Sequence, residues 1–168
     1  MGIIDALQFT PTRPTYLIQI DGSYSQGKFE EYFERVRSNP LYHYARQYRF
    51  DDVWPGMVGV EGKIILSPAL ANQMLDDFLE GQQDCEALLV HCARGKNRSP
   101  AVGLAFNRIF DFGLDHLALR EKHPGYTLHV YQTLLDVAKQ RGLGPGFDAE
   151  WEESIHDAAR DHQMRSRF

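Results

Sequence analysis

The sequence predicts an α/β fold, in which a central, twisted and mostly parallel sheet of four or five strands is flanked by helices. Two observations support this class. β-prone apolar runs alternate along the chain with segments whose apolar residues recur at helical spacing. The 168 residues are 43% hydrophobic and 24% charged, as is usual for one globular domain. We therefore expect a single domain over 1–168, with its core at about 16–141, a connector at 142–147 and a helical appendage at 148–168.

Three strands are indicated directly by the residue pattern. The run at 16–20 is β-prone and is followed by an Asp-Gly turn signal. A second strand is expected at 44–50. The third, at 87–90, is uninterruptedly apolar, which is typical of a strand in the middle of a sheet that is covered on both faces.

Five helices are predicted from helical spacing and from end signals. The second has Ser67 as its N-cap and Pro68 in its first turn, and Gly81 ends it. The segment before it, 51–62, is irregular because it contains a proline and three glycines. Thr127 is the expected cap of the last helix. The predicted helices lie at 28–37, 68–81, 100–110, 114–122 and 127–141.

The loop after the third strand has the composition of a phosphate cradle. Five residues separate Cys92 from Arg98, so the backbone N–H groups of this short loop turn inward and form a nest for an anion. The Arg98 guanidinium closes the ring and can hold two phosphate oxygens at once. We expect the phosphate to contact the loop residues Ala93, Arg94, Gly95, Lys96 and Asn97.

The same surroundings favour a thiolate at Cys92. A free cysteine titrates near ~8.5, and nest amides, a helix N-terminus and a guanidinium lower that pKa to roughly 3.5–7.5. The thiolate is then a nucleophile placed directly below the bound phosphate. The alternative is an inert cysteine buried at a strand end. Cys92 and Arg98 occur together with His91, Gly95 and Ser99, and this combination favours the nucleophile.

The run His91-Cys92-x-x-Gly95-x-x-Arg98-Ser99 resembles the signature of the cysteine-dependent protein tyrosine phosphatases, and its Arg-Ser-Pro ending resembles the dual-specificity branch. Residues 49–53 and 123–135 are similar to small bacterial and phage members of that superfamily. The resemblance implies a phosphatase-like sheet and hydrolysis of phosphomonoesters through a phosphocysteine. The implied substrates are protein phosphotyrosine, phosphoserine or phosphothreonine, with no metal and no cofactor.

The resemblance also implies a general acid that precedes the cysteine on a mobile loop, here Asp51 or Asp52. We favour Asp52, because it starts the irregular segment while Asp51 still belongs to the strand end. Alternatively, both aspartates only solvate that end. Trp54-Pro55-Gly56 is similar to the tryptophan-proline-aspartate loop of the larger tyrosine phosphatases, but a glycine stands where their acid would be. Glu61 is a third choice.

Two residues next to the nucleophile have two interpretations each. His91 either orients the loop and supports the thiolate or is a satisfied core histidine. Ser99 either donates a hydrogen bond to the departing thiolate or only caps the following helix.

Arg94 and Lys96 leave the identity of the substrate undecided, because they make the loop itself basic and therefore also suit a substrate more anionic than phosphotyrosine. Lys96 is similar to phosphoinositide phosphatases, and Asn97 before the arginine is similar to RNA 5′-triphosphatases. The formal net charge of −5 counts against broad nucleic-acid binding, so a phosphorylated protein or peptide is the first choice. A pseudophosphatase that binds without turnover is disfavoured, since nucleophile, arginine and candidate acid are all present.

The two cysteines predict no disulfide. Cys85 lies seven residues before Cys92, roughly 23 Å away along a strand at ~3.3 Å per residue, which is beyond disulfide reach. No apolar run reaches the ~18 residues of a membrane-spanning helix. The segment at 1–6 has neither a basic n-region nor a myristoylation pattern. We therefore expect a cytoplasmic protein without a membrane anchor.

Overall fold

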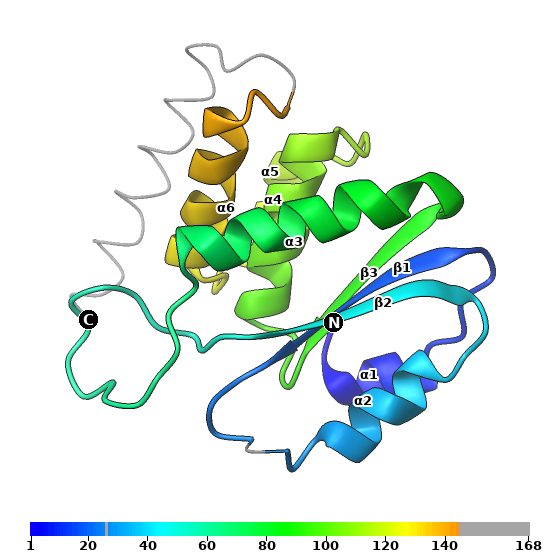
Figure 1. Ribbon diagram of the computed structural model, residues 1–168, viewed down its shortest axis with the longest axis horizontal. Coiled ribbons are helices and arrows are strands. Elements are labelled where there is room, and N and C mark those ends of the chain that lie inside the picture. The colour runs from blue at the N-terminus through cyan, green and yellow to red at the C-terminus, as the bar shows by residue number, and fades with distance from the viewer. Residues whose placement is uncertain (26, 145–168) are drawn as a thin grey trace.

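The computed structural model describes residues 1–25 and 27–144, and these form an α/β structure around three parallel strands (Figure 1). The strands are β1 (Thr15–Asp21), β2 (Tyr42–Arg49) and β3 (Ala87–Cys92), in the order β2-β1-β3. The α/β class is confirmed, but the described sheet has three strands and not four or five. The residue pattern contains only three β-prone runs, so the larger predicted number had no further run to support it. The expected appendage at 148–168 lies outside the described residues.

The central strand is β1, and all of its residues are buried. Ile18 pairs with Arg46 of β2 on one side and with Val90 of β3 on the other. The prediction that 87–90 occupies the middle of the sheet is therefore wrong, because β3 is at the edge of the described sheet. Its apolar character has another cause: helices contact β3 on both faces, and apolar content follows the covering of the faces.

Helices cover both faces of the sheet (Figure 1). On one face lie α1 (Ile3–Gln8) and α2 (Glu30–Arg37). The sequence pattern did not predict α1, which is only six residues long and therefore shows too little periodicity. The other face carries the four remaining α-helices: α3 (Pro68–Gly81), α4 (Arg98–Phe110), α5 (His116–Lys122) and α6 (Leu128–Gln140).

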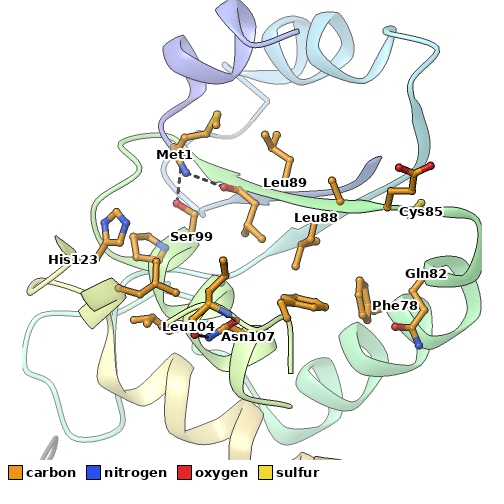
Figure 2. A pocket seen from close by; sticks show the side chains of 18 of the residues that line it. Met1, Phe78, Gln82, Cys85, Leu88, Leu89, Ser99, Leu104, Asn107 and His123 are labelled. Carbon is orange, nitrogen blue, oxygen red and sulfur yellow. Dashed lines mark hydrogen bonds between the residues drawn. The ribbon is translucent and has the colours of Figure 1, made fainter. Parts of the chain in front are cut away.

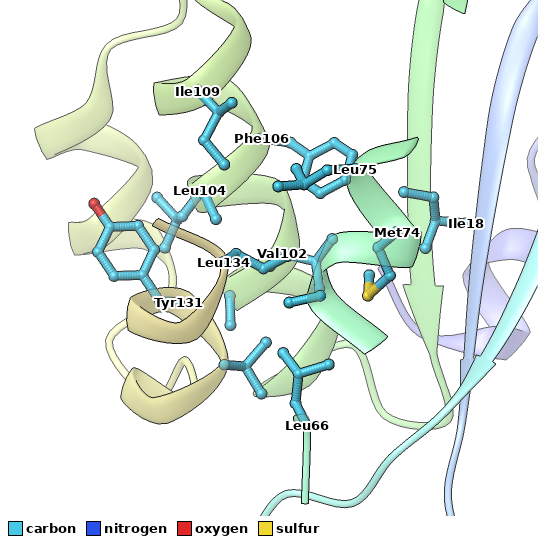
Figure 3. Close-up of a cluster of buried hydrophobic side chains, with 14 of the residues drawn as sticks. Ile18, Leu66, Met74, Leu75, Val102, Leu104, Phe106, Ile109, Tyr131 and Leu134 are labelled. Carbon is cyan, nitrogen blue, oxygen red and sulfur yellow. The ribbon is translucent and has the colours of Figure 1, made fainter. Parts of the chain in front are cut away.

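Alternation along β1 divides the core between the two faces. Ile18 and its neighbours at even positions pack with α3, α4 and α6 in the larger apolar cluster (Figure 3). Leu17 belongs to the smaller cluster with Ala6 of α1 and Val36 of α2. A two-layer covering of this kind holds the strand ends, and the loops after them, in fixed positions.

The helix start signals are confirmed for α3 but not for α6. Ser67 Oγ accepts a hydrogen bond from the Leu70 N–H at 3.2 Å, as expected of an N-cap. Thr127 occupies the N-cap position of α6, but its hydroxyl makes no capping bond. The start of α4 is Arg98 and not Pro100, so the helix begins at the last residue of the predicted phosphate-binding loop, 93–98. Within the described part of the chain, no helix has the length and apolar character needed to cross a membrane.

Candidate active site

The site predicted from the sequence lies where the three parallel strands end, because their carboxyl ends meet at one edge of the sheet. A cavity of about 860 Å³ opens there. We call it the Cys92 cavity. Its lining includes Cys92 and Arg98 from the end of β3 and the start of α4, and Asp51 and Asp52 from the segment after β2. The structure therefore brings the proposed nucleophile, arginine and both candidate acids to one cavity.

The thiol of Cys92 is held by groups of its own loop. Only 2% of Cys92 is exposed. The Gly95 N–H donates a hydrogen bond to Sγ at 3.2 Å, and Ser99 Oγ lies 3.3 Å from Sγ. Gly95 has φ +72°, and a side chain there would clash with the backbone of Met1 and Gly2. The loop thus needs a glycine at this position to turn its N–H toward the sulfur.

The balance of these contacts favours the thiolate. Burial by itself raises the pKa of Cys92, but the hydroxyl and backbone N–H of Ser99, the positive charge of Arg98 and the Gly95 N–H lower it more. The net pKa of Cys92 lies below that of an ordinary cysteine. Cys92 also lies close to the start of α4, and the positive end of a helix favours the charged form of a nearby thiol.

Ser99 is buried and has two possible partners for its one proton. Its Oγ lies 3.2 Å from the Met1 carbonyl oxygen as well as 3.3 Å from Cys92 Sγ. A hydroxyl carries a single proton, so it can donate to only one of them at a time. When Cys92 is a thiolate, the sulfur is the charged acceptor and therefore the stronger one.

The guanidinium of Arg98 is anchored to the backbone just after β2. Its Nη1 donates to the Phe50 carbonyl at 2.9 Å, at the end of β2. Gly22, after β1, packs so closely that an added Cβ would lie 2.9 Å from Arg98 Nη1 and 2.7 Å from Asp51 Oδ1. In the described residues the guanidinium makes no other hydrogen bond, which leaves its remaining donors available for an anion.

Asp51 is buried, and its carboxylate is occupied by backbone groups. Its Oδ1 accepts from the Ser23 N–H at 3.0 Å and its Oδ2 accepts from the Ile64 N–H at 2.8 Å. Both oxygens therefore serve to join the loop after β1 to the end of the irregular segment.

Asp52 has different surroundings, since it is exposed at the cavity. Its Oδ1 accepts a hydrogen bond from the Thr127 hydroxyl, which explains why that hydroxyl does not cap α6. The Thr127 N–H in turn donates to the Asn97 carbonyl at 3.3 Å. Thr127 thus connects Asp52 to the loop between Cys92 and Arg98 through two hydrogen bonds.

His91 does not line the Cys92 cavity, because successive side chains of β3 point to opposite faces of the sheet and that of His91 points away from that of Cys92. It is fully buried, with its ring 5.4 Å from that of Phe33 and its Nε2 3.1 Å from Gln19 Nε2. Burial lowers the pKa of His91 to about 4, so the ring is neutral at pH 7.

The loop residues differ in how they face the cavity. Ala93, Arg94 and Asn97 line it, whereas the side chain of Lys96 is exposed outside the lining and Glu61 takes no part in it. Much of the remaining wall of the Cys92 cavity was not predicted from the sequence, because its residues come from loops that carry no motif. This wall consists of Tyr24, Ser25, Phe29, Met57, Val60 and Lys63.

A second cavity, of about 760 Å³, lies between β3 and α4 (Figure 2). Leu88, Leu104 and Phe78 are among its apolar lining residues, and Asn107 and Cys85 also line it. Neither Cys92 nor Arg98 belongs to this lining, so the residues predicted as nucleophile and phosphate-binding arginine meet only in the Cys92 cavity among the two cavities described here.

Cys85 and Cys92 are both free thiols, as the sequence predicts. Among residues 1–25 and 27–144, no group of three or more His, Cys, Asp or Glu side chains is placed to hold a metal ion. A scan of protein-family models and a search of curated proteins both gave no match to this chain.

Proposed function

We propose that this protein is a phosphatase that hydrolyses phosphomonoesters of proteins or peptides through a phosphocysteine intermediate. One observation supports this most: Cys92 Sγ is held by the Gly95 N–H and Ser99 in the cavity that also contains Arg98 and Asp52. A lowered thiol pKa next to a guanidinium is a pattern that enzymes use to activate a nucleophile.

In the first step, the Cys92 thiolate attacks phosphorus, so that an S–P bond forms while the bond from phosphorus to the leaving oxygen breaks. The loop N–H groups and Arg98 hold the equatorial oxygens. Asp52, which lines the cavity, supplies the proton that the departing alkoxide or phenoxide needs.

In the second step, a water molecule attacks the phosphocysteine and releases phosphate. Asp52, now a carboxylate, accepts the proton of this water, and the S–P bond breaks to return the thiolate. The Ser99 hydroxyl, 3.3 Å from Sγ, stabilises the departing thiolate by donating to it.

The direct test is turnover of an aryl phosphate such as p-nitrophenyl phosphate by the reduced protein and by Cys92→Ser. We expect the variant to lose turnover by at least ~10³-fold, as removing a nucleophile does, while it still binds phosphate or vanadate through the loop and Arg98. Cys85→Ser is the matched control, because Cys85 lies at the other end of β3, and it should retain activity.

Other outcomes would overturn parts of this function. Turnover of Cys92→Ser near that of the wild type would exclude the covalent scheme. Vanadate binding without turnover in the wild type would identify a pseudophosphatase. A strong preference for a phosphoinositide or an RNA 5′-triphosphate over phosphopeptides would exclude the protein substrate class.

A further inference from the structure

We propose that Lys63 and Arg94 form a second anion-binding subsite at the mouth of the Cys92 cavity, and that this subsite takes an acidic side chain next to the phosphorylated residue of a peptide substrate. This inference rests on the proposed phosphatase function.

Exposure increases from the base of the cavity to its mouth. Cys92, at the base, is 2% exposed, whereas Tyr24 is 77% exposed and the Arg94 side chain is also exposed. Lys63 lies against Tyr24, so it belongs to the same outer part of the cavity. A group bound between Lys63 and Arg94 is therefore distinct from the phosphate at the base.

The Asp51 carboxylate fixes the backbone beside Lys63 and beside its partner Ser23. Asp51 accepts hydrogen bonds from the N–H groups of Ser23 and Ile64, which neighbour Lys63 in space and in sequence. The Lys63 ammonium donates to Ser23 Oγ at 3.3 Å and lies 2.6 Å from the centroid of the Tyr24 ring. These contacts hold the cation at the mouth without neutralising it.

Neither cation has a counterion in the described residues. The ion pairs that the structure shows use other basic residues, and neither Lys63 nor Arg94 is within ion-pair distance of a described carboxylate. The chain as a whole has a formal net charge of −5. The two cations without a described counterion at this cavity are therefore a local feature, and they do not reflect a general excess of positive charge. The basic residues that form ion pairs include Arg37, Arg46, Arg49 and Arg141.

The space between the two anion positions favours a peptide. The volume of about 860 Å³ exceeds that needed by one phosphate group. The wall that remains is largely apolar or aromatic, which suits peptide side chains better than the hydroxyls of an inositol or a ribose. Its apolar and aromatic residues include Ile4, Tyr24, Phe29, Met57 and Val60, and its polar residues include Asp21 and Ser25.

The experiment compares two phosphopeptides that differ only in a Glu or a Gln next to the phosphorylated residue. For the wild type we expect kcat/KM to be about three- to tenfold higher for the Glu peptide, mainly through KM, as two partly exposed ion pairs allow. This preference should shrink as salt is raised. Lys63→Met keeps the length of the side chain and removes its charge, so it should reduce the preference to less than about twofold.

The matched control is Lys28→Met, which removes an exposed lysine outside the cavity and should leave the preference unchanged. Equal kcat/KM for the two peptides in the wild type, or a preference that Lys63→Met retains, would overturn the subsite. Turnover of p-nitrophenyl phosphate by the wild type separates this failure from failure of the proposed function. Preferred turnover of a phosphoinositide or an RNA 5′-triphosphate would overturn the assignment to an acidic peptide.

Discussion

Asp51 and Asp52 are neighbours in the chain, but their side chains have different partners. Asp51 is buried and accepts hydrogen bonds from two backbone N–H groups, whereas Asp52 is exposed at the cavity and, among the described residues, accepts one from the Thr127 hydroxyl alone. A general acid must reach the leaving oxygen and exchange protons with water during each turnover. The surroundings of Asp52 support that role, and those of Asp51 support a positioning role.

Substituting each aspartate by asparagine separates these roles. Asp52→Asn should slow the hydrolysis of aryl phosphates with poor leaving groups by about 10²–10⁴-fold, the usual contribution of a general acid. Hydrolysis of aryl phosphates with good leaving groups should be slowed much less. Asp51→Asn should lower activity on both kinds of substrate and also destabilise the protein, because an amide cannot accept from both N–H groups. The measurement is kcat against leaving-group pKa, with thermal unfolding of each variant. Leaving-group dependence in Asp51→Asn alone would make Asp51 the acid.

Among the structural elements, the turn after β1 controls the site although it carries no reactive group. Gly22 comes directly after β1 and lies between the Asp51 carboxylate and the Arg98 guanidinium. The carboxyl end of β1 therefore contacts residues from the segments after both neighbouring strands. Close packing of this kind leaves no room for a Cβ without a shift of one charged group.

Gly22→Ala is expected to displace Arg98 or Asp51, because the added Cβ would lie 2.9 Å from Nη1 and 2.7 Å from Oδ1. We expect kcat/KM for p-nitrophenyl phosphate to fall by about 10²-fold or more, as a misplaced catalytic group does. Gly103→Ala is the control, since its Cβ would have no heavy atom within 4 Å, apart from the backbone of its own helix and its chain neighbours. That variant should keep its activity and gain about 0.5–1 kcal/mol in free energy of unfolding, because alanine favours a helix more than glycine does. Full activity of Gly22→Ala would contradict this account of the turn.

On the scale of the whole molecule, the two helical layers bury ionisable groups in their neutral form. The His91 ring, from β3, lies against Gln19 of β1 and Phe33 of α2, and burial lowers the pKa of His91 to about 4. For His116, burial together with Arg108 and Arg120 also lowers the pKa to about 4. The folded protein therefore resists binding protons that the unfolded chain accepts.

This difference predicts a loss of stability in acid. An unfolded histidine binds a proton below about pH 6.5, whereas the folded His91 remains neutral down to about pH 4, so the free energy of unfolding falls as pH falls through this window. His91 alone should lower the free energy of unfolding by about 3 kcal/mol between pH 7 and pH 4. Urea unfolding across this range measures the slope. His91→Gln should flatten it, while His43→Gln, at an exposed position, should not. An unchanged slope in His91→Gln would assign the acid sensitivity to other groups.

Features that depend on short spacing in the chain could be predicted from the residue pattern. The spacing from Cys92 to Arg98, the glycine between them and the helix that comes next are local features, so local backbone geometry was enough to predict a tight loop that leads into a helix. The order of strands and helices was predicted for the same reason, since hydrophobic periodicity is local. The short α1 was missed because six residues contain less than two helical turns.

Features that depend on contacts between distant segments became visible in the folded protein alone. Which aspartate is buried depends on Ser23 and Ile64, and the partner of Asp52 comes from the start of α6. The edge position of β3 depends on pairing that the apolar pattern of one strand does not specify. The outer cavity wall with Lys63 is built by loops that meet only in the folded state, because burial and hydrogen bonding there are set by partners far away in the chain.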